Sequence, residues 1–141
     1  VENDVIGDGT DVNVGVAVGT DDGIRVRVIE NADEKGVAEI SRLIDEADEV
    51  DNDEKEVALT LVNPGATGGD GVSPVVGIPG EAAVSVGEIR KRPFVVDGEV
   101  VARQTAPLRL TFDGRVADIT DVTRLTEDLK SVLKEPSLML L

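Results

Sequence analysis

Charged residues that could do chemistry gather near the C-terminus, in the segment Asp113-Gly114-Arg115 followed by Asp118. Two carboxylates beside an arginine can accept a proton or form an ion pair. An aspartate has an unperturbed pKa of about 4, so both carboxylates are weak bases at neutral pH unless desolvation raises their pKa. These residue types favour a structural turn, with Asp118 in an ion pair or at the N-cap of a following helix.

The residue types that the chain lacks narrow its chemistry. It contains no histidine and no cysteine, which removes the usual general base, thiol nucleophiles and thiolate metal sites. Nucleophilic catalysis would need a Ser, Thr or Lys activated without an imidazole. Eight acidic residues within residues 45–56 suit either a divalent-cation site or a solvated helix end and loop. Their spacing does not fit the pattern of an EF-hand and favours a solvated helix end and loop, so we expect no metal site.

Overall composition limits the partners and the setting. The 141 residues suit one domain, and the net charge of −15 disfavours nucleic acid and anionic membranes as partners. We expect no membrane span and no leader, since no apolar run approaches the length of a transmembrane helix. Abundant acidic residues with few lysines and aromatics are typical of a cytoplasmic protein from a high-salt organism, where salt screens self-repulsion.

Hydrophobic periodicity in the N-terminal half predicts a hairpin and a helix. Valines alternate with small or polar residues over 12–18, and apolar residues alternate with arginines over 24–28. Apolar residues at three- and four-residue spacing predict an amphipathic helix over 37–47. Asn31 or Asp33 is its expected N-cap.

The remaining periodicity predicts mostly strands. The glycine-rich loop at 63–71 could hold a phosphate, but no Gly-Lys-Ser/Thr follows it, and we favour an ordinary connection. We predict an α+β fold, with a mixed, largely antiparallel sheet, helices on one face, and no internal repeat or domain boundary. The expected elements are strands at 57–61, 72–78, 82–86 and 108–112, a hairpin at 94–101 with Asp-Gly at its tip, and a helix at 119–133.

Several motifs, in order and spacing, resemble the catalytic domain of the dihydrolipoamide acyltransferases of 2-oxoacid dehydrogenase complexes. The segment from Asp113 to Asp118 resembles the family signature Asp-His-Arg-x-x-x-Asp, with Gly114 in place of the histidine and with two residues rather than three between Arg115 and Asp118. The resemblance implies a chloramphenicol-acetyltransferase-like fold and one catalytic-domain-like unit over residues 1–141. It also implies that the N-terminal part of the family domain and the lipoyl and peripheral-subunit-binding domains are lacking. The other matching segments are Asn13 to Ile24, Val28 to Lys35, Val76 to Gly87, Pro107 to Asp113 and Pro136 to Leu141.

The resemblance also implies that two reacting groups are missing. In the family, the histidine takes a proton from the coenzyme A thiol and a hydroxyl donates to the tetrahedral oxyanion. Gly114 occupies the position of the family's histidine, and Val62 occupies the position of the residue that carries the hydroxyl. Asp113, Arg115 and Asp118 remain from the motif. Strand alternation places Thr60 on the same face as Val62, so the Thr60 hydroxyl could substitute for the missing oxyanion donor.

These losses leave three functional hypotheses. The first is an inactive acyltransferase-like domain that serves as a core or scaffold subunit. The second is an acyltransferase that still moves an acyl group between a dihydrolipoyl-type thiol and coenzyme A, with residues from a partner chain. The third is a small-molecule binding protein that uses the former substrate channel.

Two further segments bear on cofactor and partners. We expect that no cofactor is required. The resemblance points to coenzyme A, whose phosphates could meet Arg90, Lys91 and Arg92, but we favour the alternative that these three residues form a solvated turn. The terminal Met139-Leu140-Leu141 resembles the family's apolar anchor. That anchor implies a homotrimer or a higher core assembly, alone or with an active paralogue. The alternative is that this tail packs on its own helix.

Overall fold

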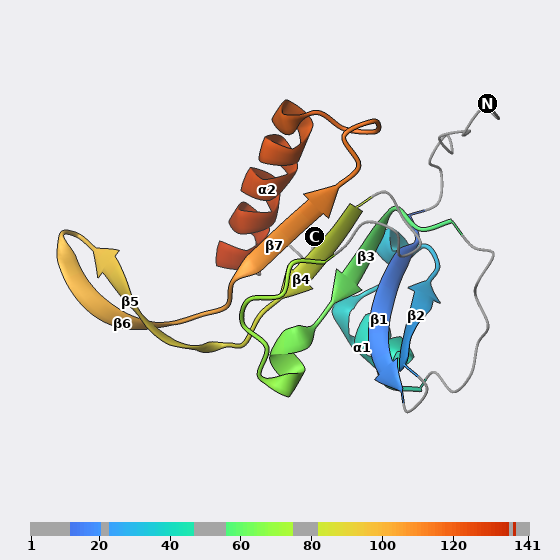
Figure 1. Ribbon diagram of the computed structural model, residues 1–141, viewed down its shortest axis with the longest axis horizontal. Coiled ribbons are helices and arrows are strands. Elements are labelled where there is room, and N and C mark those ends of the chain that lie inside the picture. The colour runs from blue at the N-terminus through green and yellow to red at the C-terminus, as the bar shows by residue number, and fades with distance from the viewer. Residues whose placement is uncertain (1–11, 21–22, 47–55, 75–81, 136, 138–141) are drawn as a thin grey trace.

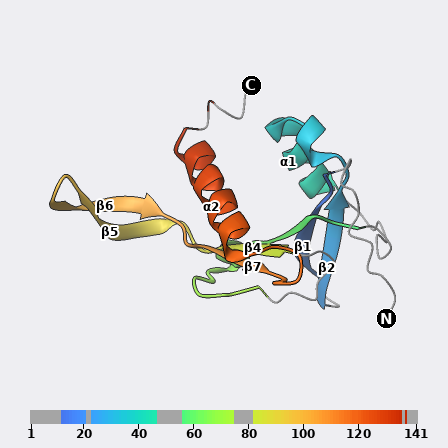
Figure 2. The same ribbon diagram turned by 90° about the horizontal axis from the view of Figure 1, so that it is seen from above.

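The computed structural model describes residues 12–20, 23–46, 56–74, 82–135 and 137, which form a mixed sheet, a separate hairpin and two helices (Figure 1). Seen from above, both helices lie on the same side of the sheet (Figure 2). The elements are β1 (Val14–Thr20), β2 (Gly23–Ile29), α1 (Val37–Glu46), β3 (Leu59–Val62), β4 (Ala82–Val86), β5 (Arg90–Val96), β6 (Glu99–Thr105), β7 (Leu108–Phe112) and α2 (Ile119–Lys134), with 3-10 helices at Ala32–Glu34 and Pro64–Thr67.

The main sheet has the strand order β2-β1-β3-β4-β7. Its outer pairs, β1 with β2 and β4 with β7, are antiparallel, whereas β3 runs parallel to both β1 and β4. The second sheet is the antiparallel pair β5–β6. The described strands therefore confirm an α+β fold with a mixed and mostly antiparallel sheet, and the two helices lie on one face of it, as predicted.

The core lies at the centre of the main sheet. Parallel strands suit this position because both of their faces can be covered. Neither helix contributes a fully buried side chain, so the described core is small and consists of strand residues and their neighbours. Its buried members are Val16, Ile29, Val57, Ala83 and Val84, with the polar Thr60 and Ser85.

Helix α1 matches the predicted helix but not its predicted N-cap. It begins at Val37 and lies near β2, where the Arg27 guanidinium donates to the carbonyl oxygen of Ile44. Asn31 and Asp33 instead belong to a separate 3-10 turn, in which Asn31 has a left-handed φ of 47° and no side-chain cap bond. The N-cap prediction was wrong because the chain leaves β2 through this turn before the helix starts.

Helix α2 is capped as predicted but poorly covered. Its start is fixed by Asp118, and it runs to Lys134. Much of its apolar stripe faces outward, since Leu125 and Leu133 are each 51% exposed and Ile119 is 71% exposed. No helix of the described residues is long and apolar enough to cross a lipid bilayer.

The β5–β6 hairpin projects away from the main sheet (Figure 1). Its tip is Asp97-Gly98, with φ values of 52° and 81°, so both residues occupy the left-handed region that a type I′ turn requires. The predicted Asp-Gly hairpin is confirmed, and its strands are longer than the alternation alone had indicated.

A few expected elements are changed or cannot be judged. The strand predicted at 72–78 is not found over 72–74, which lacks regular structure. The expected turn at 21–22, most of the acidic run (47–55), residues 75–81 and the tail from 138 to 141 lie outside the described residues.

Candidate functional site

The segment from Asp113 to Asp118 forms the tight connection between β7 and α2. The carbonyl oxygen of Asp113 accepts the amides of Val116 and Ala117 at 3.0 and 3.3 Å. One carboxylate oxygen of Asp113 also accepts the amide of Arg115 at 2.9 Å. Such bonding from an aspartate to the backbone two residues ahead is typical of an Asx turn.

The Arg115 side chain closes this turn with an ion pair. Its Nε lies 3.1 Å from both oxygens of Asp113, and a terminal nitrogen lies 2.6 Å from one of them. The side-chain bonds from Arg115, followed by its amide, lower the pKa of Asp113 to about 2. A cysteine-type thiol has a pKa of about 8.5, so Asp113 is a very weak base toward such a proton.

Asp118 is engaged in capping α2. Its carboxylate accepts the amides of Thr120 and Asp121 at 2.7 and 3.0 Å, and the Asp121 carboxylate accepts the Asp118 amide at 3.3 Å. These bonds, that of the Asp121 amide first, lower the pKa of Asp118. The predicted N-cap is confirmed as a full capping box.

Gly114 occupies the centre of the turn without being required there. Its backbone is not left-handed, and a Cβ added to it would meet nothing within 4 Å. A larger side chain at this position would therefore extend into open space rather than clash.

The two β3 residues singled out by the sequence differ in exposure. Val62 ends the strand and is partly buried. Thr60 is only 1% exposed, and its hydroxyl oxygen would be 3.1 Å from a Cβ placed on Gly15 of the neighbouring strand. The Thr60 hydroxyl thus lies within the packing between β1 and β3.

Strand register separates Val62 from the turn at Asp113. Val62 pairs with Ser85, which pairs with Arg109, whereas the turn follows Phe112 at the far end of β7. The offset of four residues from Arg109 to Asp113 corresponds to about 13 Å along the strands, and two strand spacings add about 10 Å across the sheet. β3 and β7 also point toward opposite ends of the sheet (Figure 1). Within the described residues, the chain does not bring the two positions together.

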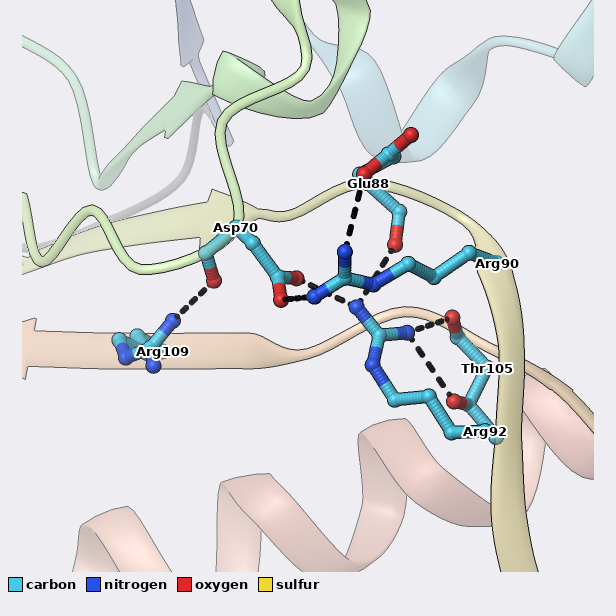
Figure 3. A network of polar contacts seen from close by, with 6 residues as sticks. All are labelled: Asp70, Glu88, Arg90, Arg92, Thr105 and Arg109. Atoms are coloured by element: carbon cyan, nitrogen blue, oxygen red, sulfur yellow. Dashed lines mark hydrogen bonds and ion pairs between the residues drawn. The ribbon is translucent and has the colours of Figure 1, made fainter.

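The basic cluster is the start of β5 and not a solvated turn. Alternate residues of a strand share a face, so Arg90 and Arg92 point to the same side, where both bind the carboxylate of Asp70 (Figure 3). Lys91 is exposed. The turn interpretation was wrong because residues 90–92 pair with residues 103–105 of β6 as a regular strand.

Sequence reasoning missed the polar network around Asp70. Its backbone carbonyl accepts a bond from Arg109 at 2.8 Å, and Arg92 also donates to the carbonyl and hydroxyl oxygens of Thr105 and to the carbonyl of Glu88 (Figure 3). The arginine partners of Asp70 lie 20, 22 and 39 residues away in sequence. No short-range pattern could reveal them, although an acidic residue closing a glycine-rich loop was a visible hint.

The glycine-rich loop itself is internally bonded. The amides of Gly68 and Gly69 donate to the carbonyls of Gly65 and Pro64 at 3.2 and 2.8 Å. Amides used in this way cannot cradle a phosphate. This geometry supports the interpretation of an ordinary connection.

Comparison with known proteins agrees with this fold. The family model for the 2-oxoacid dehydrogenases acyltransferase catalytic domain matches residues 2–141. A curated relative is the dihydrolipoyllysine-residue acetyltransferase component of the pyruvate dehydrogenase complex of Staphylococcus aureus, which is 35% identical over 140 residues. That match covers 92% of this chain and 32% of the relative, so the chain spans about a third of the length of the relative.

Solved structures give the same result. The dihydrolipoamide acetyltransferase of Azotobacter vinelandii, studied for the catalytic role of a serine, a histidine and an asparagine, superposes with a TM-score of 0.79 at 31% identity. The match covers 94% of this chain and 58% of the Azotobacter vinelandii chain. A truncated catalytic core of the 2-oxoacid dehydrogenase multienzyme complex from Thermoplasma acidophilum superposes with a TM-score of 0.73 at 32% identity. That match covers 91% of this chain and 59% of the Thermoplasma acidophilum chain. The chain therefore belongs to the 2-oxoacid dehydrogenase acyltransferase family, in the region of its catalytic domain.

Proposed function

We propose that this chain is an acyltransferase-type domain without acyl-transfer activity of its own, and that it serves as a core or scaffold subunit of an oligomeric assembly. The observation that carries the proposal is the turn at Gly114. It has space for a larger side chain, yet it holds no base, and its two carboxylates are committed to the ion pair with Arg115 and to the cap of α2.

The expected loss of rate is large. A positioned general base contributes roughly 100- to 10,000-fold, and an oxyanion donor contributes roughly 100- to 1,000-fold. The Azotobacter vinelandii enzyme was studied for the role of a histidine and an asparagine whose spacing equals that between Gly114 and Asp118. This equal spacing supports assigning Gly114 to the position of a lost histidine.

The role in assembly is supported by the uncovered face of α2. Isolated amphipathic helices are marginal in water and gain stability from packing of the apolar face. Contiguous apolar surface of this kind marks an interaction site. The Thermoplasma acidophilum relative is itself the core of a multienzyme complex. We infer a homotrimer or a higher core assembly, formed by this chain alone or with an active acyltransferase paralogue.

A second candidate function is active acyl transfer between a dihydrolipoyl-type thiol and coenzyme A, with groups supplied by a partner chain. It is favoured by the register, which places Val62 and Asp113 at opposite ends of the sheet. Any site that uses both positions must be completed by a second chain.

An acyl-transfer assay with coenzyme A, in molar salt, separates the two candidates. We expect the acyl-transfer rate of the native chain to equal the background rate, and the double variant Gly114→His, Val62→Ser to show a higher rate. Gly36→His with Val62→Ser is the matched control, because Gly36 also has open space around its Cβ position. Turnover of the native chain that is lost in Asp118→Ala but retained in Asp121→Ala, which disturbs the same cap, would establish the second function instead.

Mass determination of the same preparation tests the assembly. We expect a trimer or a multiple of it, and a strict monomer at all concentrations would contradict the scaffold role. Adding a related active acyltransferase distinguishes a mixed core from a homomeric one.

A further inference from the structure

The base of the β5–β6 hairpin is a compact joint. The chain enters the hairpin through residues 87–89 and leaves it through residues 106–107. The loop from Asn63 to Gly71 lies against the entering segment, which in turn contacts Pro107 of the leaving segment (Figures 1 and 3). Three segments that are distant in sequence therefore meet where the hairpin leaves the main sheet.

Backbone packing forms one part of this joint. The amide of Gly87 donates to Pro107 at 2.9 Å, and the amide of Glu88 donates to Gly69 at 3.1 Å. A Cβ on Gly65 would lie 2.5 Å from the carbonyl oxygen of Gly87, and a Cβ on Gly87 would lie 2.5 Å from Cγ of Pro107. Only glycine permits such approach at these two positions.

Asp70 forms the polar part of the joint. Its two carboxylate oxygens bind different arginines of β5, one to Arg90 and the other to Arg92. Its backbone carbonyl accepts from Arg109 of β7, within the main sheet. Arg92 continues to Thr105 at the end of β6. One residue thus connects both strands of the hairpin to the sheet.

The hairpin has little else to fix its direction. Phe94, Val95 and Val100 are 49%, 64% and 74% exposed, and a two-stranded hairpin without a packed face is marginal by itself. Charge-assisted bonds to a carboxylate are stronger than neutral ones. We propose that Asp70 is a positioning residue that fixes the direction in which the hairpin projects from the main sheet.

The proposal is tested by a distance measurement across the joint. The chain has no cysteine, so Asp97→Cys at the hairpin tip and Glu39→Cys on α1 allow one pair of spin labels. Labelled chain diluted into unlabelled chain reports only the distance within one molecule, whether or not the chain assembles. A failure of the proposed scaffold function would therefore leave this readout intact.

We expect a narrow distance distribution in the otherwise native chain and one at least about twofold broader in Asp70→Ala. Asp113→Asn is the control, because it also removes a carboxylate from an arginine pair but lies away from the joint. If circular dichroism shows that Asp70→Ala does not fold, the same distance distribution is measured in the milder variants Asp70→Asn and Arg92→Gln. A distribution as narrow as that of the native chain in the folded Asp70 variants would overturn the proposal.

Discussion

The chain carries two carboxylate–arginine clusters that differ in what they hold together. The Asp113–Arg115 pair joins residues two apart, and the Arg115 side chain is 81% exposed. The Asp70 cluster joins three strands, and the Arg92 side chain is only 25% exposed. The first cluster shapes a local turn, whereas the second sets the relative position of two sheets. The same chemistry therefore has a local consequence in one place and a tertiary consequence in the other.

The strongest test of this comparison removes each carboxylate in turn. Asp70→Ala leaves two arginines without their shared acceptor, and we expect it to lower the free energy of unfolding by about 2 kcal/mol, as for charged hydrogen bonds. Asp113→Ala should lower it less, because water can replace the exposed pair. Urea unfolding followed by circular dichroism measures both, and an equal loss would remove the distinction.

The packing at the joint gives the next largest effect. Gly87→Ala places a Cβ against Pro107, and such overpacking costs about 1–3 kcal/mol. Gly71→Ala is the control, since a Cβ there meets nothing within 4 Å. Identical urea midpoints for the two variants would show that the joint accommodates the added Cβ without loss of stability.

A smaller effect is expected from the cap of α2. Asp118→Ala removes the acceptor for two helix amides, so the thermal midpoint should fall. Asp118→Asn should retain most of the stability, because asparagine is also a good N-cap. A midpoint equally lowered in both variants would indicate that the charge at Asp118, rather than the cap, is what stabilises α2.

The smallest effect is a pH dependence that belongs to the local turn. The pKa of Asp113 is lowered from 3.8 to about 2 in the folded chain, first by the Arg115 side chain. Its stabilising contribution is therefore complete above pH 3.8 and is lost as the pH falls toward about 2. Acid titration of the unfolding free energy should show a shallower decline in this window for Asp113→Asn than for the native chain. Parallel profiles would contradict the assignment.

Local patterns predicted the parts of the fold that depend on neighbouring residues. The hairpin tip at Asp97-Gly98, helix α2 and its cap at Asp118 were all predicted, because each is set by turn chemistry or by helical periodicity. The N-cap at Asn31 failed, since periodicity locates a helix but does not show that a separate turn precedes it.

Contacts between distant segments were beyond local patterns. The partners of Arg90 and Arg92 depend on how the loop at Asp70 folds back on β5. The separation of Val62 from Asp113 depends on strand order and register, since a parallel strand lies between them. The residues of the candidate site were thus predictable from their types, but their division between two ends of the sheet was not.

The parallel pairing of β3 also has a consequence for how the chain folds. β3 lies between β1 and β4, and both partners are far from it in sequence. Closing such loops costs entropy before any pairing is gained, whereas β1 and β2, like β5 and β6, are separated by only two residues in sequence. We therefore expect the two hairpins to form before β3 pairs with β1 and β4 to complete the sheet.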